Sequence, residues 1–451
     1  QLTLLGAELL DIPNSLVSRV VAAAAESSRR VLGEALSASD EALLPELVDT
    51  HWEAVTGLAL IDPTRAGWLQ LRHQRYARRL AEPRRLARSL WAEAFMTGLR
   101  GKAARRDVDA LFARATSLTP TDPESQVRAA TLLPLLRGIL SVAAGDYPKA
   151  RGQLARALRT ARERGRAQVW ELAVAETYML WAMTQLGELR AMSARIQGLL
   201  SDAEPRADRF FETTLTTGTC ALAKLAEGDA AEVLRRAERV RSVWDRSSAP
   251  LPYALADLAT AYAHLYEGDT EHAEHSVQST LGPDARGAHL GIEHLDVELH
   301  MGRALVALAS ARSGRHALRV RQSLALADRI AGGIRADATP AQHVLARLLD
   351  GLLLIERRRE TDAMVALHEA EVELRRRGMA TMATIARAAH GVALGGDAGA
   401  TFIDQARHDL RAFGVRHPDA FLGIWVGPLR TECAPAARGP NARVDRAAPA
   451  R

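Results

Sequence analysis

The chain has 451 residues, which is long for one compact core, and only 4% of them are aromatic. Its net charge of +5 is small for this length and its arginines alternate with Asp and Glu, so nucleic acid is not the expected partner. Because no apolar run reaches roughly 18 residues and the two cysteines form no CxxC or bridging pattern, we expect a cytoplasmic protein without membrane contact, metal or other cofactor.

The first part of the chain reads as irregular helices. Helical patterns are predicted at 2–10, 16–36, 43–60, 84–99 and 107–117, with a further helix capped at 62–64 and running through Leu80. Because the chain begins with Gln1 in mid-helix style, we interpret 1–50 as helices that link to a missing upstream module. Residues 51–123 form a second helical segment, which ends at a break containing Pro120 and Pro123.

Residues 132–165 set the pattern for the rest of the chain. Apolar residues from Leu132 to Val142 recur at helical spacing, and Gly145 follows them as a helix stop, because glycine takes positive φ at little cost. Asp146 then suits the N-cap of a second helix. The stretch therefore predicts two antiparallel helices that cannot bury their own apolar faces.

The same punctuation recurs at intervals of 40 to 46 residues, at Gly145-Asp146, Gly187-Glu188, Gly228-Asp229, Gly268-Asp269, Gly314-Arg315 and a degenerate Arg359-Glu360. Helix pairs at such a period are typical of solenoids, in which each unit is stabilised by its neighbours. The predicted fold class is all-α, a tetratricopeptide-like α-α superhelix of helical hairpins, with repeats over 124–394. A C-terminal helix and cap at 395–430 and a disordered tail at 431–451 complete the division.

Motifs for catalysis, cofactors and metals are weak. The string at 98–102 has the glycine and lysine of a phosphate-binding loop but the wrong spacing, and alanine follows its lysine. Two groups of histidines are poor candidates for metal binding. His272 and His275 lack the HExxH spacing, and His289, His294 and His300 do not share one helix face. No GxSxG motif occurs, so we predict no catalytic residue, although an α/α toroid enzyme would share the helix-pair pattern.

Two stretches resemble the C-terminal regions of modular bacterial Ser/Thr protein kinases. The first is HWEAVTGLALIDPTRAGWLQLRHQRYARRLAEPRRLARSLWAEA at 51–94, where the matching positions are Trp52, Thr56, Gly57, Leu58, Asp62, Arg65, Gln70, Arg72, His73, Glu82, Pro83, Arg88 and Glu93. The second is RAFGVRHPDAFLGIWVGP at 411–428, which is similar to the closing motif of those proteins. Here Gly427-Pro428 reverses the usual order and Trp425 replaces a smaller residue.

In those proteins a kinase domain is followed by a signalling ATPase module and then by tetratricopeptide-like repeats. The resemblance implies a non-catalytic protein- or ligand-binding region, regulatory or scaffolding, of such a signalling protein. The kinase motifs themselves do not occur in this sequence, so any catalysis would lie before Gln1. The alternatives are the effector-binding repeats of an ATPase-type transcription regulator and, from another class, an α/α-type enzyme.

Two sets of residues are predicted to bind a protein or peptide partner, or upstream modules of the same polypeptide. One is an aromatic stripe on the first helix of a repeat, where such arrays present their concave surface: Trp170, Val174, Tyr178 and Trp181. The other is a set of polar residues in the kinase-like segment: Arg65, Arg72 and His73. The alternatives are packing between repeats for the first set, and capping or ion pairing for the second.

Overall fold

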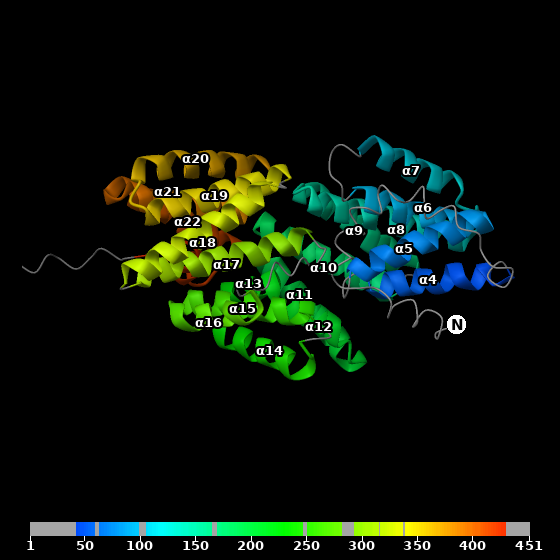
Figure 1. The fold of residues 1–451 in the computed structure, drawn as a ribbon, viewed down its shortest axis with the longest axis horizontal. Helices are drawn as coiled ribbons and strands as arrows, with labels where there is room; N and C mark the ends of the chain where they lie inside the picture. Colours follow the sequence, from blue (N-terminus) through cyan, green and yellow to red (C-terminus); the bar gives the residue numbers. More distant parts are fainter. Residues whose placement is uncertain are drawn as a thin grey trace, which may run out of the picture.

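The structure is a computed structural model, and it describes residues 42–58, 63–98, 105–164, 169–246, 250–281, 293–314, 316–336 and 339–429. These residues form 20 α-helices and two short 3-10 helices, and no strand occurs among them. The predicted all-α fold class is confirmed, because consecutive helices pack as the hairpins of an α-α superhelix (Figure 1). The helices predicted at 2–10 and 16–36 and the tail at 431–451 lie outside the described residues.

The front helices are α4 (Leu44–Leu58), α5 (Pro63–Leu80), α6 (Pro83–Gly98) and α7 (Arg105–Ser117). The array then comprises α8 (Pro123–Ala143), α9 (Tyr147–Arg164), α10 (Val169–Leu186), α11 (Leu189–Ala203), α12 (Arg209–Thr216), α13 (Ala221–Ala226), α14 (Ala230–Val243), α15 (Pro250–Glu267), α16 (Thr270–Leu281), α17 (Glu293–Ser313), α18 (Ala317–Ala336), α19 (Pro340–Glu356), α20 (Glu360–Arg376) and α21 (Ala380–Leu394). The chain ends in α22 (Gly396–Phe413) and α23 (Pro418–Val426), and the 3-10 helices are η2 (Glu204–Arg206) and η3 (Gly218–Cys220). Along the described helices, none combines the length and the apolar character that a membrane crossing requires.

One turn structure separates most paired helices of the array. After α8, Gly145 takes a φ of +71° and the Asp146 amide donates to the Ser141 carbonyl at 2.8 Å. In this Schellman arrangement, a residue in the left-handed region lets backbone amides close the last helical turn. The same long hydrogen bond recurs after Gly187, Gly228, Gly268, Arg358, Gly378 and Gly414, all of which have positive φ.

The predicted helix stops at 145, 187, 228 and 268 are therefore confirmed, and so is the predicted cap at Asp146; Glu188, at the equivalent position, makes no cap hydrogen bond. The side chains of Asp146, Asp229 and Asp269 each accept the backbone amide three residues on, at 3.0 to 3.2 Å. Two later boundaries differ in detail. Gly314 follows α17 with a φ outside the left-handed region, and Arg358, not the predicted Arg359, takes positive φ.

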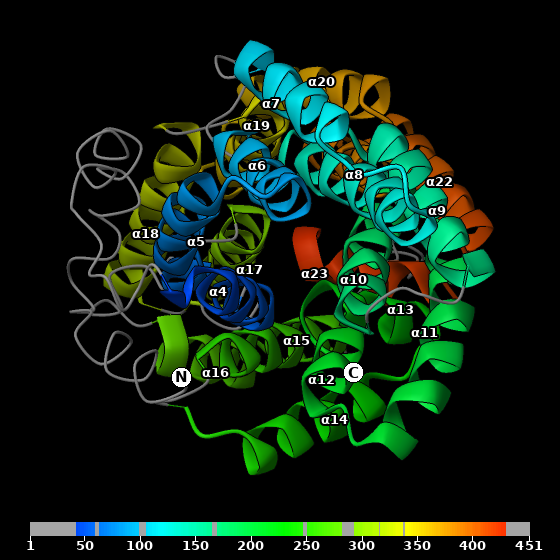
Figure 2. The same ribbon diagram turned by 90° about the vertical axis from the view of Figure 1, so that its right-hand side faces the viewer.

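The array winds back on itself, so that late hairpins pack against early ones. Figure 2 shows the helices as a ring in projection, with α19–α22 behind α6–α9. The Thr381 hydroxyl of α21 donates to the Thr184 carbonyl of α10 at 2.5 Å, and a Cβ built on Gly145 would lie 2.1 Å from the Cβ of Ala341. The expectation that each hairpin is stabilised only by its neighbours is therefore incomplete. One continuous core cluster extends from Trp52 to Val426.

The closing motif forms an interior element. Helix α23 contacts α15, α21 and α22, and it reaches inside the ring in Figure 2. Its side chains Phe421, Leu422, Ile424 and Trp425 are each at most 1% exposed. The Trp425 indole packs 5.4 Å from the Phe421 ring and 6.4 Å from the Tyr262 ring of α15, between ring centroids. Helix α23, the last of the described helices, thus occupies part of the inner face of the superhelix.

Candidate functional site

Residues of the segment 51–94 come together around Trp52. The Trp52 ring in α4 lies 5.6 Å from the His73 ring of α5, and the Arg88 guanidinium of α6 lies 4.9 Å from its centroid. On another side, the Trp170 ring of α10 approaches it edge-on at 6.3 Å. We call this group the Trp52 cluster: Asp49, Trp52, Gln70, His73, Arg88 and Trp170. It joins the front helices to the array.

Asp49 neutralises the positive charge at the edge of the cluster. Its carboxylate accepts hydrogen bonds from Arg85 at 2.6 Å and from Arg88 at 2.7 Å. Partial burial acts to raise the pKa of Asp49, but the bonds from both arginines outweigh burial and hold the pKa below its ordinary value. Because three groups from α4 and α6 are linked in this way, the carboxylate fixes the Arg88 side chain against Trp52.

His73 is held as a neutral ring inside the cluster. It is 0% exposed, and its Nδ1 lies 3.2 Å from the Oε1 of Gln70, whose Nε2 in turn donates to the Ser89 carbonyl at 3.4 Å. Burial, and then the positive charge of Arg88, lowers the pKa of His73 to about 3. The ring is therefore unsuited to proton transfer near neutral pH, and its contribution is packing and hydrogen bonding.

The cluster retains hydrogen-bonding capacity that the described residues do not use. The Nε1 of Trp52, the Nε of Arg88 and the Nε2 of His73 are all buried, and no hydrogen bond to them occurs within the described part of the chain. Buried polar atoms of this kind are usually satisfied by internal water or by a bound group. Chemically, the cluster offers buried polar atoms but contains no nucleophile.

We expect acidification to destabilise the protein through His73. The folded pKa of about 3 lies below the ordinary 6.5, so between pH 7 and pH 5 the unfolded state takes up a proton that the folded state excludes. Stability therefore falls as the pH falls, by about 2 kcal/mol for this one group over that interval. Urea unfolding at both pH values should show a loss smaller by that amount in His73→Gln; equal losses would contradict the assignment.

The predicted aromatic stripe is found mainly inside the chain. Val174, Tyr178 and Trp181 are 8%, 7% and 3% exposed, while Trp170 is half-buried against Trp52. The rings of Tyr178 and Trp181 lie 4.7 Å apart, and burial raises the pKa of Tyr178. Such contacts are what we expect if these residues fill the space between repeats. The role of these four residues as anchors for a partner stays a prediction.

The predicted polar set does not form one site. His73 is buried in the Trp52 cluster, whereas the neighbouring Arg72 is half-buried and places its guanidinium 4.3 Å from the Trp68 ring. Arg65 is also half-buried, seven residues before Arg72 on the same helix face. The alternative ion-pair partner Asp62 lies outside the described residues. What the structure brings together is therefore one residue from each predicted set, His73 and Trp170, which both contact the Trp52 ring.

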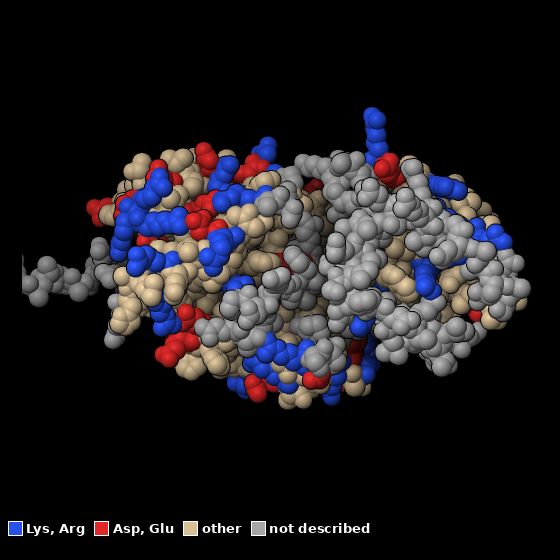
Figure 3. Space-filling view, viewed as in Figure 1, with Lys and Arg blue, Asp and Glu red and all other residues tan. Residues whose placement is uncertain are grey.

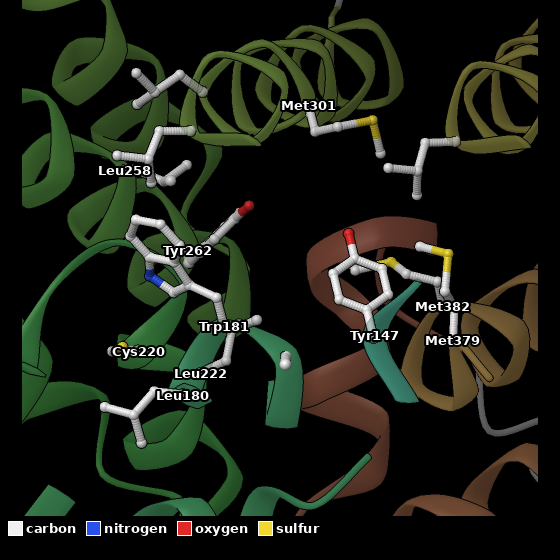
Figure 4. Close-up of a cluster of buried hydrophobic side chains, with 14 of the residues drawn as sticks. Tyr147, Leu180, Trp181, Cys220, Leu222, Leu258, Tyr262, Met301, Met379 and Met382 are labelled. Atoms are coloured by element: carbon white, nitrogen blue, oxygen red, sulfur yellow. The ribbon is translucent and has the colours of Figure 1, made fainter. Parts of the chain in front are cut away.

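A second polar group lies deep in the array and contains His294, which the sequence indicates only as a weak candidate metal ligand. Glu298 of α17 is 7% exposed, its Oε2 accepts a hydrogen bond from Thr219 at 2.5 Å, and its Oε1 lies 3.0 Å from His294 Nε2. The His294 ring lies 6.2 Å from the ring of Tyr147 and 5.2 Å from the ring of Trp181. Figure 4 shows the rings of Tyr147, Trp181 and Tyr262, which come from α9, α10 and α15. His294 and Glu298 are one helical turn apart, but their burial depends on all these helices.

The charge of Glu298 affects its neighbours. Burial, and then the carboxylate of Glu298, raises the pKa of Tyr147, Tyr262 and Cys220. The Cys220 thiol, 1% exposed, is therefore kept protonated and is a poor nucleophile. Among the described residues, no three His, Cys, Asp or Glu side chains are placed to hold a metal ion; His289 and the string at 98–102 lie wholly or mostly outside them.

Comparisons with known proteins do not add to this description. No protein-family model, no curated protein sequence and no solved structure matches the chain. The function is therefore inferred from the residues of the chain and their geometry.

Proposed function

We propose that this chain is a non-catalytic regulatory or scaffolding region of a bacterial signalling protein, in which a Ser/Thr kinase domain and an ATPase module precede the helical repeats. One observation supports the proposal most. Four residues that match the kinase-associated segment are scattered along 51–94 but converge in one cluster: Trp52, Gln70, His73 and Arg88. Because the four side chains contact one another in the folded chain, their joint occurrence in the matching segment has a physical reason.

The proposed mechanism uses the Trp52 cluster as a joint. The contact between Trp52 and Trp170 is one route by which a signal could pass between the front helices and the array. The packing of α6 on α8, with its ion pair between Arg84 and Glu124, is a second. A partner bound by the array would select one curvature of the superhelix and shift this joint. The late hairpins, packed on the early ones, extend such a shift over the whole array.

The reading frame upstream of Gln1 tests the parent protein. We expect a glycine-rich loop, a strand lysine, an HRD-type catalytic loop and a DFG motif, followed by an ATPase module. A parent frame that contains the repeats with a helix-turn-helix domain and without kinase motifs would contradict the proposal and favour a transcription regulator.

Charge reversal on α5 tests regulation by this region. In the full-length protein, Arg65→Glu with Arg72→Glu is expected to change autophosphorylation by about tenfold, a typical size for coupling between sites. The matched control is Arg156→Glu with Arg159→Glu on α9, two exposed arginines with the same change in charge. If both double variants keep the wild-type rate and partner binding, these arginines have no regulatory role.

A further inference from the structure

A groove follows the outward face of α18. It has a volume of about 570 Å³ and is lined by Arg321, Leu324, Ala325, Asp328, Arg329, Gly332 and Arg335 of α18 together with Arg357 at the end of α19. The α18 residues recur at the helical spacing of one face. Figure 3 shows Lys and Arg side chains gathered over α18–α20 on this side of the molecule, interspersed with Asp and Glu. The groove is thus a shallow surface feature with more positive than negative charge and with apolar carbon at Leu324, Ala325 and Gly332.

The positive charge of the groove exceeds what its own acids neutralise. Arg357 pairs with Asp328 at 2.9 Å, and Arg335 pairs with Asp350 of α19. Arg321 and Arg329 are exposed, and within the described residues neither has an ion-pair partner. Burial, and then the charge of Arg329, lowers the pKa of the neighbouring Arg303. Two cations on the rim therefore remain available for an external anion.

The dimensions of the groove indicate the kind of ligand. The two available arginines, Arg321 and Arg329, are eight residues apart, which is about 12 Å along the helix axis. A ligand with acidic groups at a similar spacing would meet both of them. The floor of Leu324, Ala325 and Gly332 offers apolar carbon but no aromatic ring on which a base could stack. A ligand that matches this face is elongated, with apolar side chains on one side and acidic groups beside them.

We propose that this groove binds an acidic amphipathic peptide segment of a partner protein. An amphipathic helix of about 14 residues spans about 21 Å and lays its apolar face into such a groove. Its carboxylates meet Arg321 and Arg329, whose planar guanidinium groups suit paired hydrogen bonds to carboxylates. The groove shares no residue with the Trp52 cluster, so this site does not depend on the identity of the parent protein.

The test uses the whole chain and a fluorescein-labelled 14-residue peptide that repeats Glu and Leu at helical spacing. By fluorescence anisotropy at low salt, Arg321→Glu with Arg329→Glu is expected to weaken binding about tenfold or more, because attraction becomes repulsion. The matched control, Arg156→Glu with Arg159→Glu on α9, should stay within roughly twofold of wild type. A peptide with Ser in place of Leu should bind more weakly to the wild-type chain.

Three results would overturn the proposal. The first is absence of peptide binding to the wild-type chain at low salt. The second is an equal loss in both double variants, which would show attraction to net charge alone. The third is displacement of the peptide by a single-stranded RNA of similar length or by inorganic phosphate. If that competitor also binds the groove variant, but not the control, more weakly than wild type, the groove is a site for a phosphate ligand. Unchanged circular dichroism of both variants ensures that binding, not folding, is compared.

Discussion

Gly145→Ala is expected to destabilise the protein far more than Gly268→Ala, although both glycines end helices with nearly the same backbone. Their φ values are +71° and +78°, so each substitution incurs about 1–2 kcal/mol for a side chain in the left-handed region. The new methyl group at 268 meets nothing within 4 Å, whereas at 145 it lies 2.1 Å from the Cβ of Ala341. Relieving that overlap adds about 1–3 kcal/mol, which urea unfolding would measure.

A third variant separates the overlap from the backbone effect. Ala341→Gly removes the methyl group that Gly145→Ala would meet, so the double variant should recover most of the extra loss. Ala341→Gly should not rescue Gly268→Ala, because the methyl group added at 268 meets no other atom within 4 Å. The cycle of single and double variants gives the coupling energy directly. Equal losses at 145 and 268, with no coupling to Ala341, would mean that the two turns of the superhelix are not in contact.

Trp425→Ala is expected to cost about 3–5 kcal/mol of unfolding free energy, the usual range for removing a fully buried large side chain. Trp425 is 1% exposed, and its backbone carbonyl also accepts a hydrogen bond from Arg312 at 3.0 Å. Truncation leaves a cavity between α15 and α23, so amide hydrogen exchange should rise in both helices.

The control for Trp425 is Leu318→Ala on α18. Leu318 is 61% exposed, and its truncation should change the unfolding free energy by less than about 0.5 kcal/mol. Trp425→Phe should fall between the two, since a smaller ring still fills part of the space. If Trp425→Ala unfolds like wild type, the closing motif is not an interior element.

The hairpins could be predicted from sequence because their signals are local. A glycine stop and an acidic cap lie within a few residues of each other, and φ values at Gly145 and Gly228 follow from that chemistry. Where the signal is degenerate, prediction was less accurate: Arg358 takes the left-handed conformation without a glycine, and the equivalent turn at Gly378 was missed.

The Trp52 cluster and the inner contacts could not be predicted, because they depend on how the superhelix winds. Trp52 and Trp170 belong to helices separated by more than a hundred residues, and Gly145 meets Ala341 only after a full turn of the array. Winding is the sum of small rotations between successive hairpins, and no single residue encodes it. The same holds for Glu298, whose carboxylate looks like an ordinary exposed acid in the sequence.

The position of α23 affects how the protein is made. On the ribosome, α13 and α15 emerge long before α23 is synthesised, and until then the surfaces that contact α23 are not covered by it. A chain released before residue 426 lacks a complete α23. Such a truncated chain exposes apolar surface of the kind that chaperones and proteases recognise. The nine-residue helix α23 thus completes the core of the described array.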